Sequence, residues 1–327
     1  MTKICVFGAG AIGGYLAVHL AQVEGVEVSV VGRGEHLAAI RRDGLRLDSP
    51  LGEKRARVRA TDRAQELGPQ DYVIVALKSH QVTAALDDVG ALLGPETVVL
   101  PPTTGIPYWY FHGLPGPLRN HQIERLDPKG LQWCAVAPQR VIGCVYWVAS
   151  EVTAPGVIHH DGKLSRFPIG EPDGTNSERI MRLAKIFAAS GLDAPIVPDI
   201  RAWIWAKMIS SLCWNPVAVL TTATLSEMNA TPEVVALVQR MMIEADAMAL
   251  KLGVDRMPIP IDQRIEAARN AGNHKMSMLQ DLERGRSLEI DVLIDSAVAM
   301  RELAQSPTPT IDDVYTLLRM RAAAARR

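Results

Sequence analysis

The sequence is short of the features that would assign it to several large protein classes. It contains four cysteines in 327 residues and no CxxC pair, so neither a disulfide framework nor a cysteine-based zinc site is expected. It lacks an apolar run of about 18 residues, the length that a membrane-spanning helix requires. Lysines and arginines (35) nearly balance aspartates and glutamates (36), so the charge supports no general affinity for nucleic acid or for a membrane surface.

The chain is long enough and apolar enough for two hydrophobic cores. Its 327 residues exceed one average domain, and 48% of them are hydrophobic. Cys5, Cys134, Cys144 and Cys213 stand in apolar contexts, which is typical of reduced structural thiols. We therefore expect a soluble, cytoplasmic, two-domain protein with no nucleic-acid or membrane partner.

A glycine-rich motif follows the first predicted strand. The β-branched run at residues 3–7 leads directly into Gly8, Gly10 and Gly13, and a helical pattern then continues to Leu20. In this setting the first glycine permits a tight turn, the second lets the backbone approach a pyrophosphate, and the third lets the helix pack on the strand. The motif therefore predicts a dinucleotide site with the phosphates at the helix N-terminus.

Arg33 follows the second predicted strand, residues 26–31, within Gly32-Arg33-Gly34. An NAD site usually places a carboxylate at this strand end for the ribose 2′-hydroxyl, whereas an arginine can pair with a 2′-phosphate. The position therefore favours NADPH. Glu35 is the competing candidate and would favour NADH, and a further alternative is that Arg33 is an exposed loop residue.

Two more apolar runs, residues 72–77 and 97–100, are predicted to be buried parallel strands. The first brings Lys78 and Gln81 to its carboxyl end, and the second leads to Thr104. Because ligands bind at this edge of a parallel sheet, Lys78 and Gln81 are cofactor candidates. The alternative is an ordinary helix start capped by Ser79.

The remaining elements of the first half carry little visible chemistry. Adjacent His159 and His160 on a strand would point to opposite faces, so they are not expected to share a metal ion. The other predictions are a hairpin at 45–58, an irregular insertion at 113–139, strands at 141–149 and 194–197, and a helix at 177–189.

The pattern changes at residue 198 from strands and glycines to continuous helices. We therefore expect an α/β Rossmann-type domain at residues 1–198 and an all-α domain at residues 199–327. Helices are predicted at 199–216, 232–252, 261–271 and 279–300, the last with a break near Gly285 and a restart capped by Ser287. The methionine-rich helix at 232–252 leaves two alternatives open, a core element or the surface of a homodimer.

The helix at 199–216 carries a polar stripe on an otherwise apolar surface. Asp199 is its predicted N-cap, and Pro216 marks a boundary or a kink. Lys207, Ser211 and Asn215 recur at i, i+4 and i+8, which places them on one narrow face. One interpretation is a lysine that only extends to solvent from a core helix. The other is a site, because a semi-buried lysine beside tryptophans has a destabilised ammonium form and can give up a proton.

Taken together, these stretches resemble the ketopantoate reductase (2-dehydropantoate 2-reductase) family over nearly the full length. The segments that carry the resemblance are GAGAIGG at 8–14, VVGRG at 30–34, LKSHQ at 77–81, IWAKM at 204–208, NP at 215–216 and SMLQDLERGRSLEID at 277–291. The resemblance implies a Rossmann domain followed by a helical domain, with NADPH reducing a 2-keto acid in the cytoplasm as part of pantothenate biosynthesis.

The resemblance also implies roles for individual residues. Lys207 matches the catalytic lysine that polarises and protonates the substrate carbonyl, and Glu289 matches the acid that hydrogen-bonds the substrate hydroxyl. The substrate-binding candidates are Ser211, Asn215 and Ser277. The cofactor-binding candidates are Gly8, Gly10, Ala11, Ile12, Gly13, Arg33, Lys78, Gln81 and Thr104.

Two positions depart from the family's pattern. The family usually has an asparagine where Thr104 stands and often has one where Ser211 stands, so two side-chain amides are missing. We therefore expect ketopantoate or a closely related 2-keto acid as the substrate. The alternatives are a dehydrogenase for another 2-hydroxy or 2-keto acid on the same fold and a non-catalytic NADP(H)-binding regulatory protein.

Overall fold

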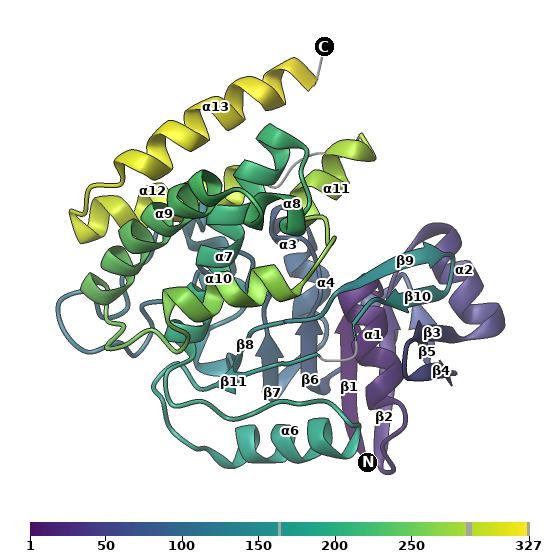
Figure 1. Ribbon diagram of the computed structural model, residues 1–327. Coiled ribbons are helices and arrows are strands. Elements are labelled where there is room, and N and C mark those ends of the chain that lie inside the picture. The colour runs from purple at the N-terminus through teal and green to yellow at the C-terminus, as the bar shows by residue number, and fades with distance from the viewer. Residues whose placement is uncertain (163–164, 286–289, 326–327) are drawn as a thin grey trace. The chain divides into compact units, whose positions relative to one another are not determined.

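The computed structural model describes residues 1–162, 165–285 and 290–325 of the chain (Figure 1). It divides into two compact units. The first consists of Met1–Thr103 and Pro107–Ile200, and the second consists of Thr104–Ile106 and Arg201–Arg327. The second unit therefore includes a short segment that lies far from the rest of it in the sequence.

A parallel sheet forms the centre of the first unit. Its strands lie in the order β5-β2-β1-β6-β7, with β1 at Thr2–Phe7, β2 at Val26–Val31, β5 at Arg59–Thr61, β6 at Gln70–Val75 and β7 at Leu93–Leu100. The strands form because their β-branched side chains, such as Val30 and Ile74, are fully buried. All the strands that the sequence predicts for this sheet are confirmed, with small shifts in their bounds.

Helices connect and flank these strands. α1 packs on β1 and β2, and α2 packs on β5. α6 begins as predicted, because the Ser177 side chain accepts a hydrogen bond from the backbone N–H of Ile180. The helices of this unit are α1 (Ala11–Leu20), α2 (Gly34–Asp43), α3 (Ser79–Val82), α4 (Leu86–Gly90), α5 (Leu131–Ala135) and α6 (Glu178–Ala189).

A second sheet packs against α1. Its order is β4-β3-β10-β9, with β3 at Leu45–Ser49, β4 at Gly52–Ala56, β9 at Ser150–Ala154 and β10 at Val157–His160. The predicted hairpin is confirmed as the β3–β4 pair, but its parallel pairing with β10 joins distant parts of the chain. A Cβ on Gly14 of α1 would lie 2.7 Å from the side chain of Ile158, so this glycine allows the close packing.

Two strand predictions in the first unit are wrong. Within residues 141–149 only β8 (Gly143–Cys144) is a strand, and it pairs with β11 (Ile169–Gly170). Residues 194–197 form no strand, since Ile196 makes a single bridge to Ile169. Pro195 lacks the N–H group that a regular ladder would use, which explains the second failure.

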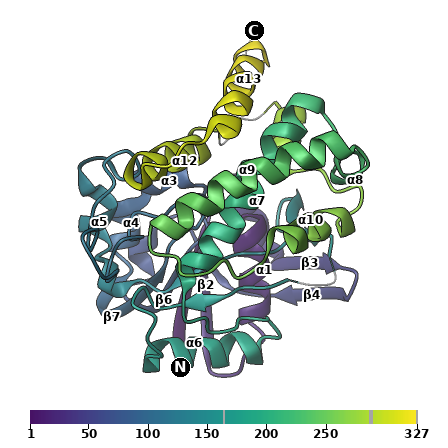
Figure 2. The ribbon, with the colours of Figure 1, turned by 60° about the vertical axis from the view of Figure 1, so that its left-hand side comes forward.

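The second unit consists of helices, as predicted (Figure 2). They are α7 (Ile200–Thr221), α8 (Leu225–Asn229), α9 (Pro232–Lys251), α10 (Ile261–Asn270), α11 (Ser277–Glu283), α12 (Ile290–Ala304) and α13 (Pro309–Ala325). α9 is central to the packing of this unit, because it contacts α8, α10, α12 and α13. The predicted break near Gly285 is confirmed, whereas the predicted cap Ser287 lies outside the described residues. The fold class, an α/β Rossmann-type domain plus an all-α domain, is confirmed.

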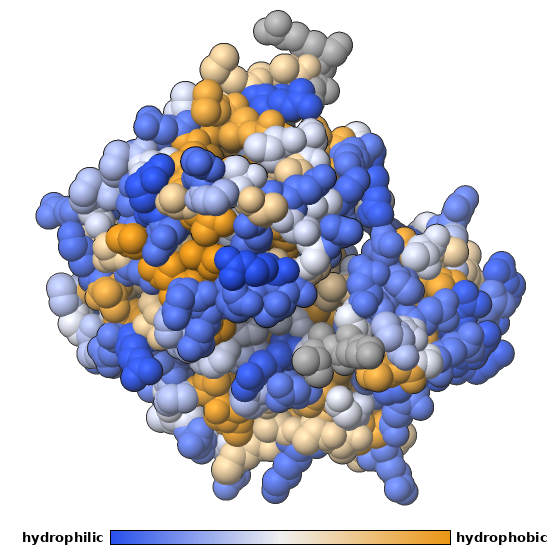
Figure 3. Space-filling model, in the orientation of Figure 1, coloured by the Kyte–Doolittle hydropathy of each residue, from blue (hydrophilic) through white to orange (hydrophobic). Residues whose placement is uncertain are grey.

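The methionines of α9 belong to the core of the second unit. Met241, Met242 and Met248 are fully buried. Other apolar side chains of this unit reach the surface, where Figure 3 shows orange patches among blue polar side chains. The large exposed ones on α9 and α13 are Ile243, Leu250, Leu317 and Met320.

α7 continues through Pro216, so of the two alternatives predicted for this residue, a boundary or a kink, the boundary is wrong. A proline has no N–H to donate to the carbonyl of Leu212, four residues earlier. The hydroxyl of Tyr315 on α13 donates to that carbonyl instead, at 3.2 Å. Burial raises the pKa of Tyr315 well above its usual value, so the hydroxyl stays protonated and remains a donor. A tertiary contact thus supplies the bond that the sequence of the helix cannot.

Candidate active site

The glycine-rich segment after β1 forms a tight turn held by backbone hydrogen bonds. Gly8 has a φ of +105°, which residues with a Cβ rarely adopt. The N–H groups of Gly8 and Ala9 both donate to the carbonyl of Val31 at the end of β2, at 2.9 and 3.2 Å. A Cβ on Gly13 would lie 1.9 Å from the carbonyl oxygen of Gly8, so only glycine lets α1 start this close to the turn.

α1 begins at the end of this turn, and no side chain among the described residues caps it. Gly10 is the N-cap residue and is exposed, and a Cβ built on it would meet nothing within 4 Å. Ala11 and Ile12, in the first turn, are half-buried. A helix N-terminus combines N–H donors with the positive end of the helix dipole. The geometry therefore fits the pyrophosphate of a dinucleotide.

The carboxyl end of β6 lies beside the glycine turn. Phe7 at the end of β1 is in register with Val75 at the end of β6, and the carbonyl of Phe7 accepts from the N–H of Ala76 at 2.8 Å. Adjacent parallel strands whose connections leave toward opposite sides of a sheet form a crevice at their carboxyl ends, and β1 and β6 are such a pair. The topology thus places the residues that follow β6 at the same edge as the turn.

Lys78 and Gln81 are those residues, and both are half-buried. Lys78 occupies the N-cap position of α3, and Gln81 lies within that helix, where its N–H donates to the carbonyl of Lys78 at 2.9 Å. Ser79 is the first residue of α3, so the cap position that the alternative interpretation gave to Ser79 belongs to Lys78.

Arg33 and Glu35 both lie just beyond the carboxyl end of β2 and are exposed. Arg33 occupies the N-cap position of α2 in an extended conformation, with φ −149° and ψ 165°. Glu35 stands in the first turn of α2. Arg33 therefore lies in the turn directly after β2, whereas Glu35 lies inside α2.

The segment with Thr104 is part of the second compact unit, although the sequence assigns its surroundings to the first domain. The N–H of Ile106 donates to the hydroxyl of Ser296 on α12 at 3.0 Å. Gly105 has a φ of +77°, and a Cβ there would lie 2.5 Å from the same hydroxyl oxygen. The sequence gives no sign of Ser296, because its role depends on a contact between segments 190 residues apart.

Two residues of the polar stripe of α7, Lys207 and Ser211, lie on the partly exposed face of that helix, whereas Asn215 is buried. Between residues 201 and 219, the half-buried positions are Trp203, Lys207, Ser210 and Ser211, and the other side chains are buried. Cys213 lies on the buried side, and burial raises the pKa of its thiol, so it is a protonated core residue. The stripe therefore presents Lys207 and Ser211 together.

Asn215 contacts the other two predicted substrate-binding residues. It is 2% exposed, and its side-chain amide donates to the carbonyl of Ser211 at 3.0 Å. Its carbonyl oxygen accepts from the N–H of Met278 at 3.0 Å and faces the hydroxyl of Ser277 at 3.5 Å. Asn215 thus holds the first turn of α11 against α7, and Ser211, Asn215 and Ser277 form one polar cluster.

Sequence comparison identifies both halves of this arrangement. Residues 4–107 match the family described as Ketopantoate reductase PanE/ApbA, and residues 199–322 match Ketopantoate reductase PanE/ApbA C terminal. The chain belongs to this family. It is accordingly an oxidoreductase of the 2-dehydropantoate 2-reductase type, and the resemblance stated from the sequence is confirmed.

Individual members and structural neighbours extend the comparison. A 2-dehydropantoate 2-reductase of Mesorhizobium japonicum is 49% identical over 318 residues, which cover 97% of each chain. The crystal structure of a 2-dehydropantoate 2-reductase from Geobacter metallireducens has a TM-score of 0.83 at 26% identity, covering 97% of this chain and 99% of that one. The ternary structure of D-mandelate dehydrogenase with NADH and anilino(oxo)acetate shares the fold, with a TM-score of 0.81 at 20% identity and 99% coverage of both chains.

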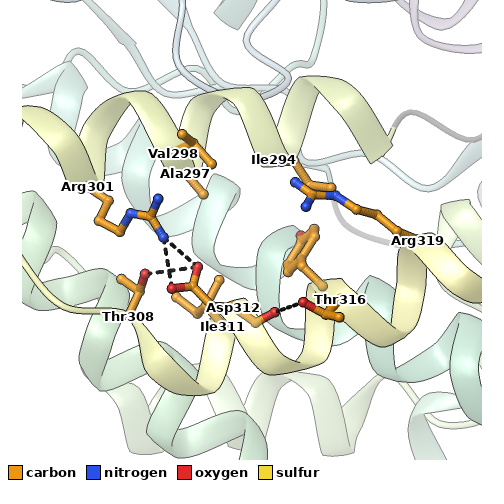
Figure 4. Close-up of a pocket in the computed structure, with 10 residues that line it drawn as sticks. Ile294, Ala297, Val298, Arg301, Thr308, Ile311, Asp312, Thr316 and Arg319 are labelled. Atoms are coloured by element: carbon orange, nitrogen blue, oxygen red, sulfur yellow. Dashed lines mark hydrogen bonds and ion pairs between the residues drawn. The ribbon is translucent and has the colours of Figure 1, made fainter.

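A hollow of about 250 Å³ lies in the second unit of this ketopantoate reductase family member (Figure 4). It lies between α12 and α13, and the Arg301–Asp312 ion pair spans it at 2.7 Å. Among the residues that the structure describes, none of the predicted catalytic or binding residues lines it. Glu289, the second predicted catalytic residue, lies outside the described residues.

Other site chemistries find little support in the described part of the chain. All four cysteines are free; Cys134 is exposed, contrary to expectation, and the other three are buried. Residues 1–162, 165–285 and 290–325 contain no group of three or more histidine, cysteine or acidic side chains placed to hold a metal ion. Within the same ranges, no helix has both the length and the apolar character needed to cross a membrane.

Proposed function

We propose that this protein reduces ketopantoate, or a closely related 2-keto acid, to the 2-hydroxy acid with NADPH as the reductant. The observation that carries the proposal is the polar cluster of the helical unit. Lys207 and Ser211 share the half-buried face of α7, and Asn215 links Ser211 to Ser277. The 49% identical relative named 2-dehydropantoate 2-reductase supports the same substrate class.

Reduction of a ketone requires a hydride at the carbonyl carbon and a proton at the carbonyl oxygen. NADPH, when bound, supplies the hydride. We assign the proton to Nζ of Lys207, which polarises the carbonyl and protonates the oxygen as the C=O bond becomes a C–OH group. The hydroxyls of Ser211 and Ser277 orient the substrate. Asn215 bonds the backbone carbonyl of Ser211 and lies 3.5 Å from the Ser277 hydroxyl. Glu289 is assigned a hydrogen bond to the substrate hydroxyl.

The residues at the carboxyl edge of the parallel sheet fit a nicotinamide dinucleotide. The turn at Gly8, the open space at Gly10 and the uncapped start of α1 suit the pyrophosphate. Arg33 supports NADPH over NADH because a guanidinium pairs with a 2′-phosphate, whereas Glu35 would serve a free ribose hydroxyl. Ala11, Ile12, Gly13, Lys78, Gln81 and Thr104 complete the proposed cofactor-binding set.

A dehydrogenase for another 2-keto acid is the second candidate, and Thr104 and Ser211 favour it. Thr104 stands where the resembled family usually has an asparagine, and Ser211 stands where it often has one. The side-chain amide of Asn215 already donates to the carbonyl of Ser211 and accepts from the N–H of Met278, so it is oriented toward these backbone groups. A pocket with different hydrogen-bond donors selects a different substrate from the same class.

The proposal is tested by measuring the rate at which NADPH absorbance decreases when the protein is given each of a panel of keto acids. The panel contains ketopantoate, 2-ketoisovalerate and phenylglyoxylate, and NADH replaces NADPH in parallel assays. We expect the highest kcat/KM for a branched 2-keto acid with NADPH. Preference for phenylglyoxylate would support the second candidate. Intact NADPH binding without turnover of any acid would contradict reductase function and indicate a non-catalytic NADP(H)-binding regulatory protein.

A further inference from the structure

A histidine that the sequence analysis passed over contacts the glycine turn. His36 on α2 is half-buried, and its Nε2 lies 2.7 Å from the carbonyl oxygen of Ala9. Its Nδ1 accepts from the N–H of Gly156 at 3.0 Å. Because Nδ1 accepts, the proton of the neutral ring must reside on Nε2, which donates to Ala9. Two backbone groups therefore fix one tautomer of the ring.

The hydrogen bond from His36 controls the direction of an amide at the start of α1. In a trans peptide unit the C=O of one residue and the N–H of the next point in opposite directions. Holding the carbonyl of Ala9 therefore directs the N–H of Gly10 away from His36. The N–H of Ala9 is already engaged by Val31, so both sides of this residue are anchored immediately before the N-cap of α1.

The other side of the imidazole contacts the turn between β9 and β10 of the second sheet. Gly156 connects β9 to β10 with a φ of +77°, and its carbonyl accepts from the N–H of Arg46 at 2.9 Å. A Cβ on Gly156 would lie 3.3 Å from the Cβ of Ala39 on α2, so the turn packs closely on the helix that carries His36. The ring therefore forms hydrogen bonds to the backbone at Ala9 and at Gly156, and both residues belong to the first unit.

We propose that His36 is a positioning residue for the dinucleotide. As the neutral Nε2–H tautomer it fixes the Ala9–Gly10 peptide plane, so that the N–H of Gly10 is oriented for a phosphate oxygen of the cofactor before the cofactor arrives. The N–H of Gly156 keeps the ring in this tautomer. This inference rests on the proposed cofactor binding and assigns a residue of α2 to it.

Two substitutions separate the two hydrogen bonds of His36. A glutamine side chain can place an N–H donor where Nε2 stands, and an asparagine side chain can place an acceptor where Nδ1 stands. His36→Gln therefore keeps the bond to Ala9, and His36→Asn keeps the bond to Gly156. We expect the dissociation constant of NADPH, measured by fluorescence titration of the full chain, to stay within about twofold for His36→Gln and to rise about tenfold for His36→Asn.

Thermal unfolding of both variants and a matched control complete the test. Each variant loses one hydrogen bond, so similar unfolding temperatures with different NADPH affinities support positioning. His159→Asn, which changes a partly exposed histidine of β10, serves as the control and should retain native affinity. Equal NADPH affinities of the two His36 variants, whether native or weakened, would overturn the inference. If the native chain binds neither NADPH nor NADH, the proposed function itself fails, which this design distinguishes.

Discussion

The glycine turn of the first unit and the polar stripe of the second unit are built from different kinds of atoms. The turn offers backbone N–H groups; the absence of side chains at Gly8 and Gly13 shapes it, and Gly10 leaves open space in front of it. The stripe offers the side chains of Lys207 and Ser211, with Asn215 bonded behind them. A site made of backbone N–H groups requires that side chains be absent where they would block it. A site made of side chains requires particular functional groups and neighbours that fix their positions.

The two regions also differ in how they are supported. The turn is held by neighbouring strands through the carbonyl of Val31 and, by our inference, through His36. The cluster around Asn215 depends on α11, which lies 62 residues along the chain from that residue. Substitutions in the turn should therefore act by adding atoms that collide with the backbone. Substitutions in the stripe should act by removing a functional group.

The largest effect is expected in the stripe. Lys207→Ala removes the proposed proton donor, so turnover should fall about 10²- to 10⁴-fold while NADPH binding persists. Steady-state kinetics and a fluorescence titration measure the two quantities. Ser210→Ala on the same half-buried face is a matched control and should keep its turnover, since the Ser210 hydroxyl bonds the carbonyl of Ala206. Full turnover of Lys207→Ala would remove Lys207 from the mechanism.

The next effect tests the steric fit of the turn. In Gly13→Ala the added methyl group would collide with the carbonyl of Gly8, so we expect a loss of about 1–3 kcal/mol in stability together with weaker NADPH binding. Gly10→Ala meets no neighbour and has a permitted φ of −69°, so it should weaken NADPH binding with little change in stability.

Denaturant unfolding and NADPH titration separate these two glycines. Gly90→Ala on α4, where a Cβ also meets nothing within 4 Å, is the control and should preserve both quantities. Native NADPH affinity in Gly10→Ala would show that the cofactor does not approach this backbone.

The smallest effect on activity is expected for the hydrogen bond between Tyr315 and the carbonyl of Leu212 on α7. Tyr315→Phe leaves the buried carbonyl of Leu212 without its donor, so the free energy of unfolding should drop by about 1–3 kcal/mol, with turnover nearly unchanged. Pro216→Ala restores a backbone N–H for the same carbonyl. Tyr315→Phe should therefore cost less in the Pro216→Ala background, and a denaturant-unfolding cycle that shows no coupling would contradict this account.

Local sequence patterns predicted many of the helices and strands, because the residues that form each pattern also cause the local structure. β-Branched runs such as residues 26–31 became buried strands, and the glycine spacing at 8–13 matches a turn in which Gly8 and Gly13 leave no room for a Cβ. Two strand predictions failed, the one at 194–197 because Pro195 lacks the N–H group of a regular ladder. Residues 141–149 bury Val141, Ile142 and Val145 without a regular ladder, so apolar character alone did not make a strand.

The sequence by itself determined the family, the fold class, the glycine turn and the i, i+4, i+8 placement of Lys207, Ser211 and Asn215. Only the tertiary structure decided which groups support them. It joined Asn215 to Ser277, carried α7 through Pro216 with a hydroxyl from Tyr315, placed Ser296 against Ile106 and set His36 against Ala9. Helical and strand periodicities arise from neighbours along the chain, whereas these hydrogen bonds join residues 27 to 190 positions apart, and no local pattern encodes such pairs.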